Sequence, residues 1–204
     1  MSRGFSRVRA AASVLLSLGL VAGLAACAAD PLADQYREGD NKGFVAAANG
    51  FEVVEIKAAD RTDPIEFEGV LDTGDKTSSA DYAGDVTVVN FWYAGCAPCR
   101  VEAPELAKVY DAFEGQDVKF LGVNLYDGAE ASQAFAKKFG VQYPSALTTV
   151  DGSIKLAFAG ATPLNAVPVT LVLDKEGRVA ARLIGQIEEP SILETLVRET
   201  LEES

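Results

Sequence analysis

Residues 86–99 read Val-Thr-Val-Val-Asn-Phe-Trp-Tyr-Ala-Gly-Cys-Ala-Pro-Cys, and this stretch decides the fold of the chain. The run 86–92 is apolar on both faces, which predicts a central strand covered on both sides. If a helix follows this strand, Cys96 and Cys99 stand one helical turn apart and can form a small disulfide. The first thiol then lies at the unpaired amides and positive dipole end of that helix, where a thiolate is favoured. A thiolate is the form that attacks disulfides, so we expect Cys96 to attack and Cys99 to resolve.

The first 26 residues have the form of a secretory signal. Three arginines within the first nine residues precede an apolar run that ends in Leu-Ala-Ala-Cys at residues 24–27. This ending resembles a bacterial lipobox, in which Cys27 is lipidated and becomes the first residue of the mature protein. An uncleaved membrane anchor is the alternative, but a spanning helix needs about 20 apolar residues. We therefore expect a signal over 1–26 and a lipid-anchored protein on the extracytoplasmic face of a cell membrane.

Lipidation of Cys27 would leave Cys96 and Cys99 as a pair among the three cysteines of the chain. A disulfide between residues this close in sequence closes a very short loop, and it is therefore a poor structural staple. A catalytic disulfide is the better interpretation, with a structural one as the alternative.

Composition excludes several classes of function. The 18 basic and 30 acidic residues give a formal net charge of −12, and loss of the three arginines in 1–26 would make it −15. Such a surface repels nucleic acid and anionic lipid. Histidine is absent and methionine occurs once, which removes Ser-His-Asp and Cys-His catalysis, histidine-containing zinc sites and a soft copper site. We expect neither a metal nor a bound cofactor.

The remaining pattern predicts a tether over 27–50 and one α/β domain over 51–204. A strand at 51–56 should lie at a sheet edge, and a short hairpin should follow over 65–75. The order of elements predicts a mixed sheet with helices on both faces. Further strands are expected at 86–92, 118–125, 169–173 and 178–184, and helices at 99–114, 129–139, 153–159 and from Pro190 onward, with Ile192, Leu193, Leu196, Val197 and Leu201 as the buried stripe of the last helix.

Several separated segments carry a family resemblance. Residues 90–106, Asn-Phe-Trp-Tyr-Ala-Gly-Cys-Ala-Pro-Cys-Arg-Val-Glu-Ala-Pro-Glu-Leu, resemble the active-site segment of the TlpA/ResA-type thioredoxin-like lipoproteins. Ala-Val-Pro-Val-Thr at 166–170 and Asp-Lys-Glu-Gly-Arg at 174–178 resemble the cis-proline loop of that family and the hairpin after it. The resemblance covers roughly residues 60–204. It implies a thioredoxin-like fold with an N-terminal β-hairpin extension. The chain departs from the family at Ala94-Gly95, where many members carry a bulky residue and Trp.

The resemblance also implies roles for single residues. Pro168 would follow a cis peptide bond held against the cysteines, so that Val167 offers its backbone to a substrate chain. Glu102 would be an acid/base group for the resolving thiol, with a favourable charge in a first helical turn as the alternative. Trp92 and Tyr93 would border the disulfide as an apolar contact surface, and a core role is an equally good interpretation of Trp92. We expect the amide of Asn90 to satisfy local backbone groups.

The function implied is a membrane-tethered reductase of disulfides in extracytoplasmic proteins, with cytochrome c maturation as one use. A membrane protein that carries reductant across the bilayer would return electrons to it. An oxidant of the same fold is a first alternative, because nothing in the sequence decides the direction of transfer. A thiol peroxidase of the AhpC/TSA kind is a second, although such enzymes usually place Thr where this chain has Tyr93. The third is a lipoprotein that binds a partner without catalysis.

Overall fold

The computed structural model describes residues 44–46, 51–163 and 166–203, and its centre is a sheet of seven strands in the order β1-β2-β9-β8-β5-β6-β7. Strands β5, β6 and β7 are parallel, whereas β5–β8, β8–β9, β9–β2 and β2–β1 pair antiparallel. The sheet is therefore mixed, as predicted. The bounds are β1 Phe44–Ala46, β2 Glu52–Glu55, β5 Val86–Trp92, β6 Val118–Asn124, β7 Ser145–Leu147, β8 Val169–Leu173 and β9 Val179–Ile184.

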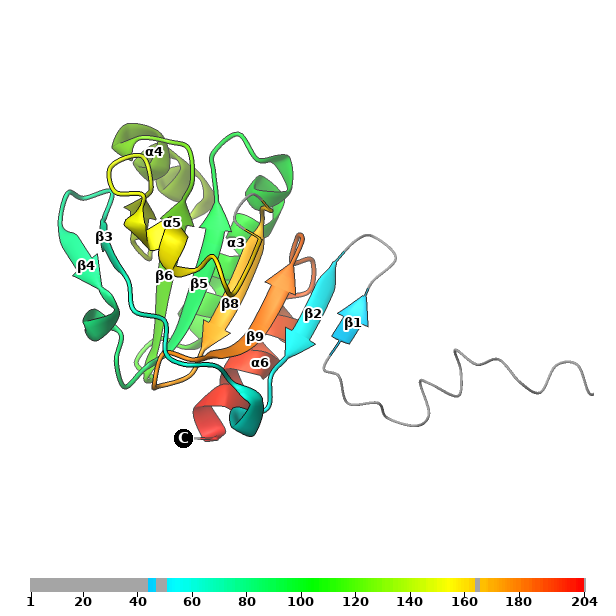
Figure 1. Cartoon of the computed structure of the whole chain (residues 1–204). Helices are drawn as coiled ribbons and strands as arrows, with labels where there is room; N and C mark the ends of the chain where they lie inside the picture. Colours follow the sequence, from blue (N-terminus) through cyan, green and yellow to red (C-terminus); the bar gives the residue numbers. More distant parts are fainter. Residues whose placement is uncertain (1–43, 47–50, 164–165, 204) are drawn as a thin grey trace, which may run out of the picture. The chain divides into compact units, whose positions relative to one another are not determined.

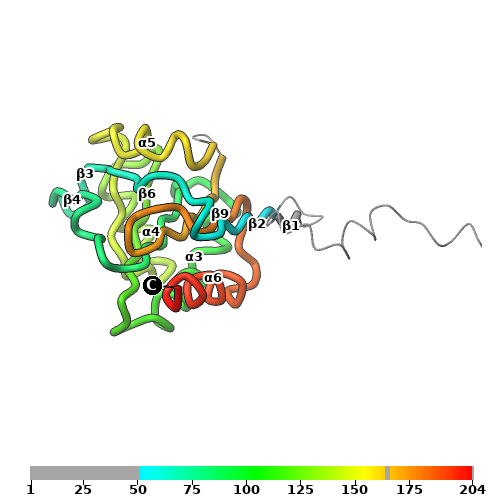
Figure 2. The backbone as a smooth tube through the Cα atoms, turned by 60° about the horizontal axis from the view of Figure 1, so that its bottom comes forward, coloured from blue at the N-terminus to red at the C-terminus, as the bar shows by residue number. Residues whose placement is uncertain are grey.

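Helices lie on both faces of this sheet (Figure 1). On one face, α3 (Ala97–Ala112) contacts both α6 (Pro190–Glu202) and α4 (Ala129–Phe139). The short helix α5 (Ser153–Ala157) lies on the other face. Figure 2 shows the strands running between α5 and the pair α3 and α6. The expected arrangement of helices about a central sheet is confirmed.

A small hairpin lies beside α5. Its strands β3 (Glu68–Val70) and β4 (Lys76–Ser78) pair antiparallel as a separate sheet, and Leu71 bridges to β7. The turn between them contains Gly74 at φ +91°, a conformation that favours glycine. The expected hairpin is thus present, although its first strand begins three residues later than predicted. Two 3₁₀ turns flank this region, η2 Ala58–Asp60 and η3 Ser79–Asp81.

Every side chain of β5 is buried, because the strand packs against both helical layers. Successive residues alternate between two cores. Val86 and Val88 pack in the core beneath α3 and α6, whereas Val89 and Phe91 pack in the core beneath α5. Asn90 continues the face of Val86 and Val88, so this polar side chain points toward α3.

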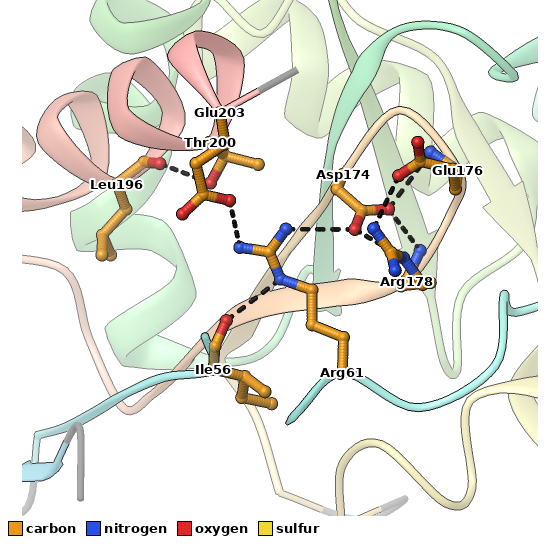
Figure 3. A network of polar contacts seen from close by, with 8 residues as sticks. All are labelled: Ile56, Arg61, Asp174, Glu176, Arg178, Leu196, Thr200 and Glu203. Carbon is orange, nitrogen blue, oxygen red and sulfur yellow. Dashed lines mark hydrogen bonds and ion pairs between the residues drawn. The ribbon is translucent and has the colours of Figure 1, made fainter. Parts of the chain in front are cut away.

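An ion-pair network connects distant parts of the domain (Figure 3). It lies near the start of β5, because Asp174 follows Leu173 of β8, which pairs with Thr87 of β5. Arg61 lies at its centre, and its side chain is 4% exposed. The guanidinium pairs with Asp174 at 3.1 Å and with Glu203 at the end of α6. Arg178 binds the same Asp174 oxygen at 2.9 Å. One buried arginine therefore joins the segment after η2 to the β8–β9 turn and to α6.

Four elements differ from the prediction in more than their exact bounds. β1 lies within the stretch predicted as a tether, so the folded domain begins no later than Phe44, and β2 is not an edge strand. β7 lies where a loop was expected. Ile192 is 36% exposed, because it is one position out of register with the buried residues of α6, which are Leu193, Leu196, Val197 and Thr200.

The predicted signal over 1–26 and the lipidated Cys27 lie outside the described residues. Among the helices that the structure does describe, none has the length and apolar character needed to cross a membrane.

Candidate active site

Cys96 and Cys99 form a disulfide at the start of α3, with 5.3 Å between their Cα atoms. Cys96 is the N-cap residue of this helix, in extended backbone conformation, and Pro98 occupies the first turn. The backbone amide of Cys99 donates a hydrogen bond to Cys96 Sγ at 3.1 Å. The first sulfur thus receives one of the unpaired amides of the helix, as the sequence predicts.

An attacking thiol at a helix start is expected to be exposed, and the structure corrects this expectation for Cys96. Cys96 is 3% exposed and Cys99 is 1% exposed in the oxidised form. Both belong to a small apolar cluster, against which Tyr93, Ala94 and Val167 pack. Although it stands at a helix start, Cys96 is therefore buried within apolar surroundings in the oxidised protein.

The loop before β8 faces this cluster through Val167. The peptide bond between Val167 and Pro168 is cis, as the resemblance implies. Pro168 is buried and its carbonyl accepts a hydrogen bond from the Gly185 amide at 2.9 Å. Within the described residues, the amide and carbonyl of Val167 have no hydrogen bond.

Glu102 lies in α3 with only 1% of its surface exposed. Its Oε1 accepts a hydrogen bond from Asn90 Nδ2 at 2.9 Å, and its Oε2 accepts one from the Ile187 amide at 3.0 Å. Burial raises the pKa of this carboxyl to about 8, against the lowering effect of the two hydrogen bonds. Glu102 thus changes its charge close to neutral pH, and it is not merely an exposed acid in a first helical turn.

Asn90 has a different role from the one predicted. Its amide donates to two side chains, Glu102 and Thr170 Oγ1, the second at 3.1 Å, and not to local backbone groups. The reason is the alternation of β5, which turns Asn90 toward α3. Asn90 and Cys99 also line one cavity of about 10 Å³. This is roughly the space of a single water molecule.

Trp92 is a core residue, as the second of its two interpretations predicts, and it belongs to the same apolar cluster as both cysteines. The side chain is 4% exposed, and its ring lies 4.2 Å from that of Phe135 in α4. The indole Nε1 donates to Ser145 Oγ at 3.2 Å. A Cβ at Gly122 would overlap both partners of this bond, so glycine leaves the space for it. Trp92 supports the cysteine cluster from inside.

Sequence reasoning missed two polar residues that hold the loop before Cys96. Asp127 Oδ2 accepts hydrogen bonds from the Ala94 amide at 2.6 Å and from Asn124 Nδ2 at 2.9 Å. Asn124 is fully buried, and its Oδ1 accepts the amides of Tyr126 and Asp127. Their position could have indicated this role. Asn124 ends β6 and Asp127 follows it, and the carboxyl ends of parallel strands such as β5 and β6 meet at one sheet edge.

No group of three or more His, Cys, Asp or Glu side chains within the described part of the chain is arranged to hold a metal ion. The site therefore offers the chemistry of two cysteine sulfurs and one buried carboxyl.

A redox-capable cysteine pair at the start of a helix, after a central strand and facing a cis-proline loop, defines a thioredoxin-like α/β protein. The model of the AhpC/TSA family matches residues 57–182, and the chain belongs to this family. The expected thioredoxin-like fold is confirmed by solved structures. A DsbF homologue from Corynebacterium diphtheriae is 29% identical with a TM-score of 0.61, over 72% of this chain and 92% of that one. A thiol:disulfide interchange protein from Chlorobium tepidum is 26% identical with a TM-score of 0.62, over 69% and 97%.

Relatives of known name support the resemblance to the ResA type. The thiol-disulfide oxidoreductase ResA of Bacillus subtilis is 30% identical over 119 residues, which is 58% of this chain and 64% of that protein. The thiol:disulfide interchange protein HelX of Rhodobacter capsulatus is 32% identical over 109 residues, 53% and 57% of the two chains. The match thus spans less than two thirds of the length of these relatives.

Proposed function

We propose that this protein is an extracytoplasmic thiol–disulfide oxidoreductase that reduces disulfides in partner proteins. The observation that carries the proposal is the hydrogen bond from the Cys99 amide to Cys96 Sγ. In the reduced protein the same amide, with the helix dipole behind it, stabilises a thiolate on Cys96. This is the species that thiol–disulfide exchange requires.

The reaction takes two exchanges. The Cys96 thiolate attacks one sulfur of the partner disulfide, forms a mixed disulfide and releases the other partner sulfur as a thiolate, which takes up a proton. The Cys99 thiol then loses its proton and attacks Cys96 Sγ, which releases the second partner thiolate. Two electrons pass to the partner, and Cys96 and Cys99 end as the disulfide seen in the structure.

Glu102 is placed to take the proton that Cys99 must lose. Asn90 connects the two, because its amide binds the carboxyl and its side chain lines the same small cavity as Cys99. One water in that cavity would complete a path for the proton. A carboxyl with a pKa of about 8 is matched to proton transfer near neutral pH.

The partner segment is held at Val167. Its backbone amide and carbonyl are without hydrogen bonds in the described residues, and the side chain packs on the cysteine cluster. An extended client segment could pair with this backbone as a strand adds to an open edge. Pro168, after the cis bond, fixes the direction in which Val167 faces.

The cellular setting follows from the N-terminal sequence and from the ResA resemblance. Residues 1–26 act as a secretory signal, Cys27 carries the lipid that holds the protein at the outer face of the cytoplasmic membrane, and a membrane thiol protein supplies electrons. Proteins that enter cytochrome c maturation are one client class. Replacement of Cys27 by Ser should release the protein from the membrane fraction and abolish incorporation of labelled fatty acid. Unchanged fractionation of this variant would argue against the anchor.

One set of measurements tests the direction of transfer. The reduction potential should lie near the value of about −270 mV known for thioredoxin, and the protein should reduce insulin disulfides. A potential near −120 mV, with oxidation of reduced substrates, would favour the oxidant. Sustained turnover of peroxide would favour the thiol peroxidase that the family name also covers.

Two cysteine variants complete the test. Cys96→Ser should lose all insulin reduction, whereas Cys99→Ser should accumulate a mixed disulfide with the substrate that a reductant cleaves. Cys27→Ser is the matched control, because it removes a cysteine outside the pair and should keep full reduction. Full activity of Cys96→Ser would exclude the mechanism.

A further inference from the structure

The residue directly before the attacking cysteine offers no side chain to a partner. Gly95 is exposed, and a Cβ placed on it would lie 3.2 Å from Cε2 of the Tyr93 ring. Tyr93 therefore occupies the space beside Cys96 that a side chain at Gly95 would take. Tyr93 also packs against the cluster that contains both cysteines.

A second tyrosine extends this aromatic surface outward. The rings of Tyr93 and Tyr126 meet edge to face, with 5.1 Å between their centroids. Tyr126 is 54% exposed, and Lys155 Nζ lies 5.7 Å from its ring centroid. Large apolar side chains this exposed are individually common. Tyr126 is unusual because its ring contacts Tyr93, which packs against the cluster that contains both cysteines.

Hydrogen bonds of Asp127 and Asn124 connect the loops that carry the two tyrosines. Asp127 binds the Ala94 amide next to Tyr93, and Asn124 binds the Tyr126 amide as well as Asp127. Asn124 is fully buried, and Thr149 Oγ1 adds a bond to the Asp127 carbonyl at 3.0 Å. A surface whose backbone is fixed in advance loses less conformational entropy when a ligand binds.

We propose that Tyr93 and Tyr126 form a docking surface for a large apolar side chain next to the cysteine that a client presents to Cys96. The proposal rests on the proposed function and names the class of client. Tyr93 and Val167 both pack against the cluster that contains the two cysteines, so a client held at the Val167 backbone brings its neighbouring residues toward the tyrosines. The formal net charge of −12 disfavours acidic segments, and the client segment is therefore neutral or basic.

The test uses two neutral peptides that differ at one position, Phe or Ser beside a single cysteine, each joined to glutathione by a mixed disulfide. The reduced full-length protein in detergent converts each to free peptide thiol and glutathione, and its own two thiols become a disulfide. No other electron source is needed. The second-order rate constant of this single turnover is measured for both peptides, and for glutathione disulfide as a small substrate.

We expect wild type to prefer the Phe peptide by about 3- to 10-fold, the range that an aromatic contact supplies. Tyr126→Ala should bring this ratio close to 1, and its rate should fall more for the Phe peptide than for glutathione disulfide. Tyr126→Phe keeps the ring and should keep the ratio. Ile192→Ala, which removes an exposed apolar side chain from α6, is the matched control and should behave as wild type.

Two results would overturn the docking surface while leaving the proposed function intact: equal rates of wild type with both peptides, or an unchanged ratio in Tyr126→Ala. A reduced wild-type protein that transfers electrons neither to the peptides nor to glutathione disulfide would instead overturn the proposed function, and this inference with it.

Discussion

Asp174, which follows β8, and Glu102, in α3, are both almost fully buried, with exposures of 3% and 1%. Asp174 accepts hydrogen bonds from two guanidinium groups, those of Arg61 and Arg178, and from the backbone of its own turn. Glu102 accepts hydrogen bonds only from uncharged groups, the amide of Asn90 and the backbone of Ile187. No ion pair to Glu102 is present in the described part of the chain.

The two buried acids therefore differ in the charge of their partners. Two cations next to a buried carboxylate offset the cost of removing its charge from water. Amide donors offset less of that cost, and the pKa of Glu102 is therefore raised to about 8 by its burial. The neutral surroundings of Glu102 leave its carboxyl able to change its protonation state near neutral pH.

The largest expected effect is a loss of stability when Arg61, a partner of Asp174, is replaced. Arg61→Ala removes the bonds to Asp174, Glu203 and the Ile56 carbonyl. The buried Asp174 then keeps only one of its two cationic partners. Breaking one side of a buried ion pair costs about 3–5 kcal/mol. Urea unfolding of the oxidised protein should show this loss in the free energy of unfolding.

Arg178→Ala is the matched control for this variant. It removes the other cation of Asp174, but the Arg178 side chain is 30% exposed and water can replace it. Its loss of stability should be clearly smaller than that of Arg61→Ala. Equal losses would mean that burial does not decide the strength of this network.

The second prediction concerns the pH dependence of stability. The pKa of Glu102 is about 8 in the folded protein and close to 4.5 in the unfolded chain. Between these values the unfolded chain has released a proton that the folded protein keeps, so stability falls as the pH rises. The loss from this one group between pH 4.5 and 7 is at most about 3 kcal/mol.

Glu102→Gln should remove this slope without titrating itself. The readout is the difference in unfolding free energy between wild type and variant at several pH values, with the disulfide intact so that neither thiol titrates. The variant should gain relative to wild type as the pH rises from 4.5 to 8. A constant difference over this range would contradict a raised pKa.

The sequence predicts the fold best where one strand or helix carries its own complete pattern. Strand β5 and helix α4 have the predicted bounds, because a continuous apolar run defines the first and a terminal glycine ends the second. β1 and β7 are three residues each, and they exist as strands only because a neighbour pairs with them. So short a segment has no periodicity of its own.

The candidate site also has a part that the sequence predicts and a part that it does not. The cysteine pair and the proline of the cis bond are visible as motifs, and the structure places both where the motifs imply. The bond between Asn90 and Glu102 joins residues on a strand and on the helix packed over it, and no spacing rule predicts that contact. The same holds for Asp127 and Ala94, which come together from two loops. Such contacts depend on how elements pack, which a single sequence does not contain.

The smallest expected effect is a shift in the pKa of Glu102 when Asn90 is replaced. The neutral amide of Asn90 donates a hydrogen bond to Glu102. Asn90→Ala leaves Glu102 Oε1 without its hydrogen bond. Because that bond favours the charged carboxylate, its loss should raise the pKa of Glu102 further, by about one unit. Carbon-13 NMR of the labelled carboxyl measures this shift directly. Thr170→Val is the control, since it removes the other partner of the amide and leaves the bond to Glu102 in place. An unchanged or lowered pKa in Asn90→Ala would mean that the amide does not stabilise the carboxylate of Glu102.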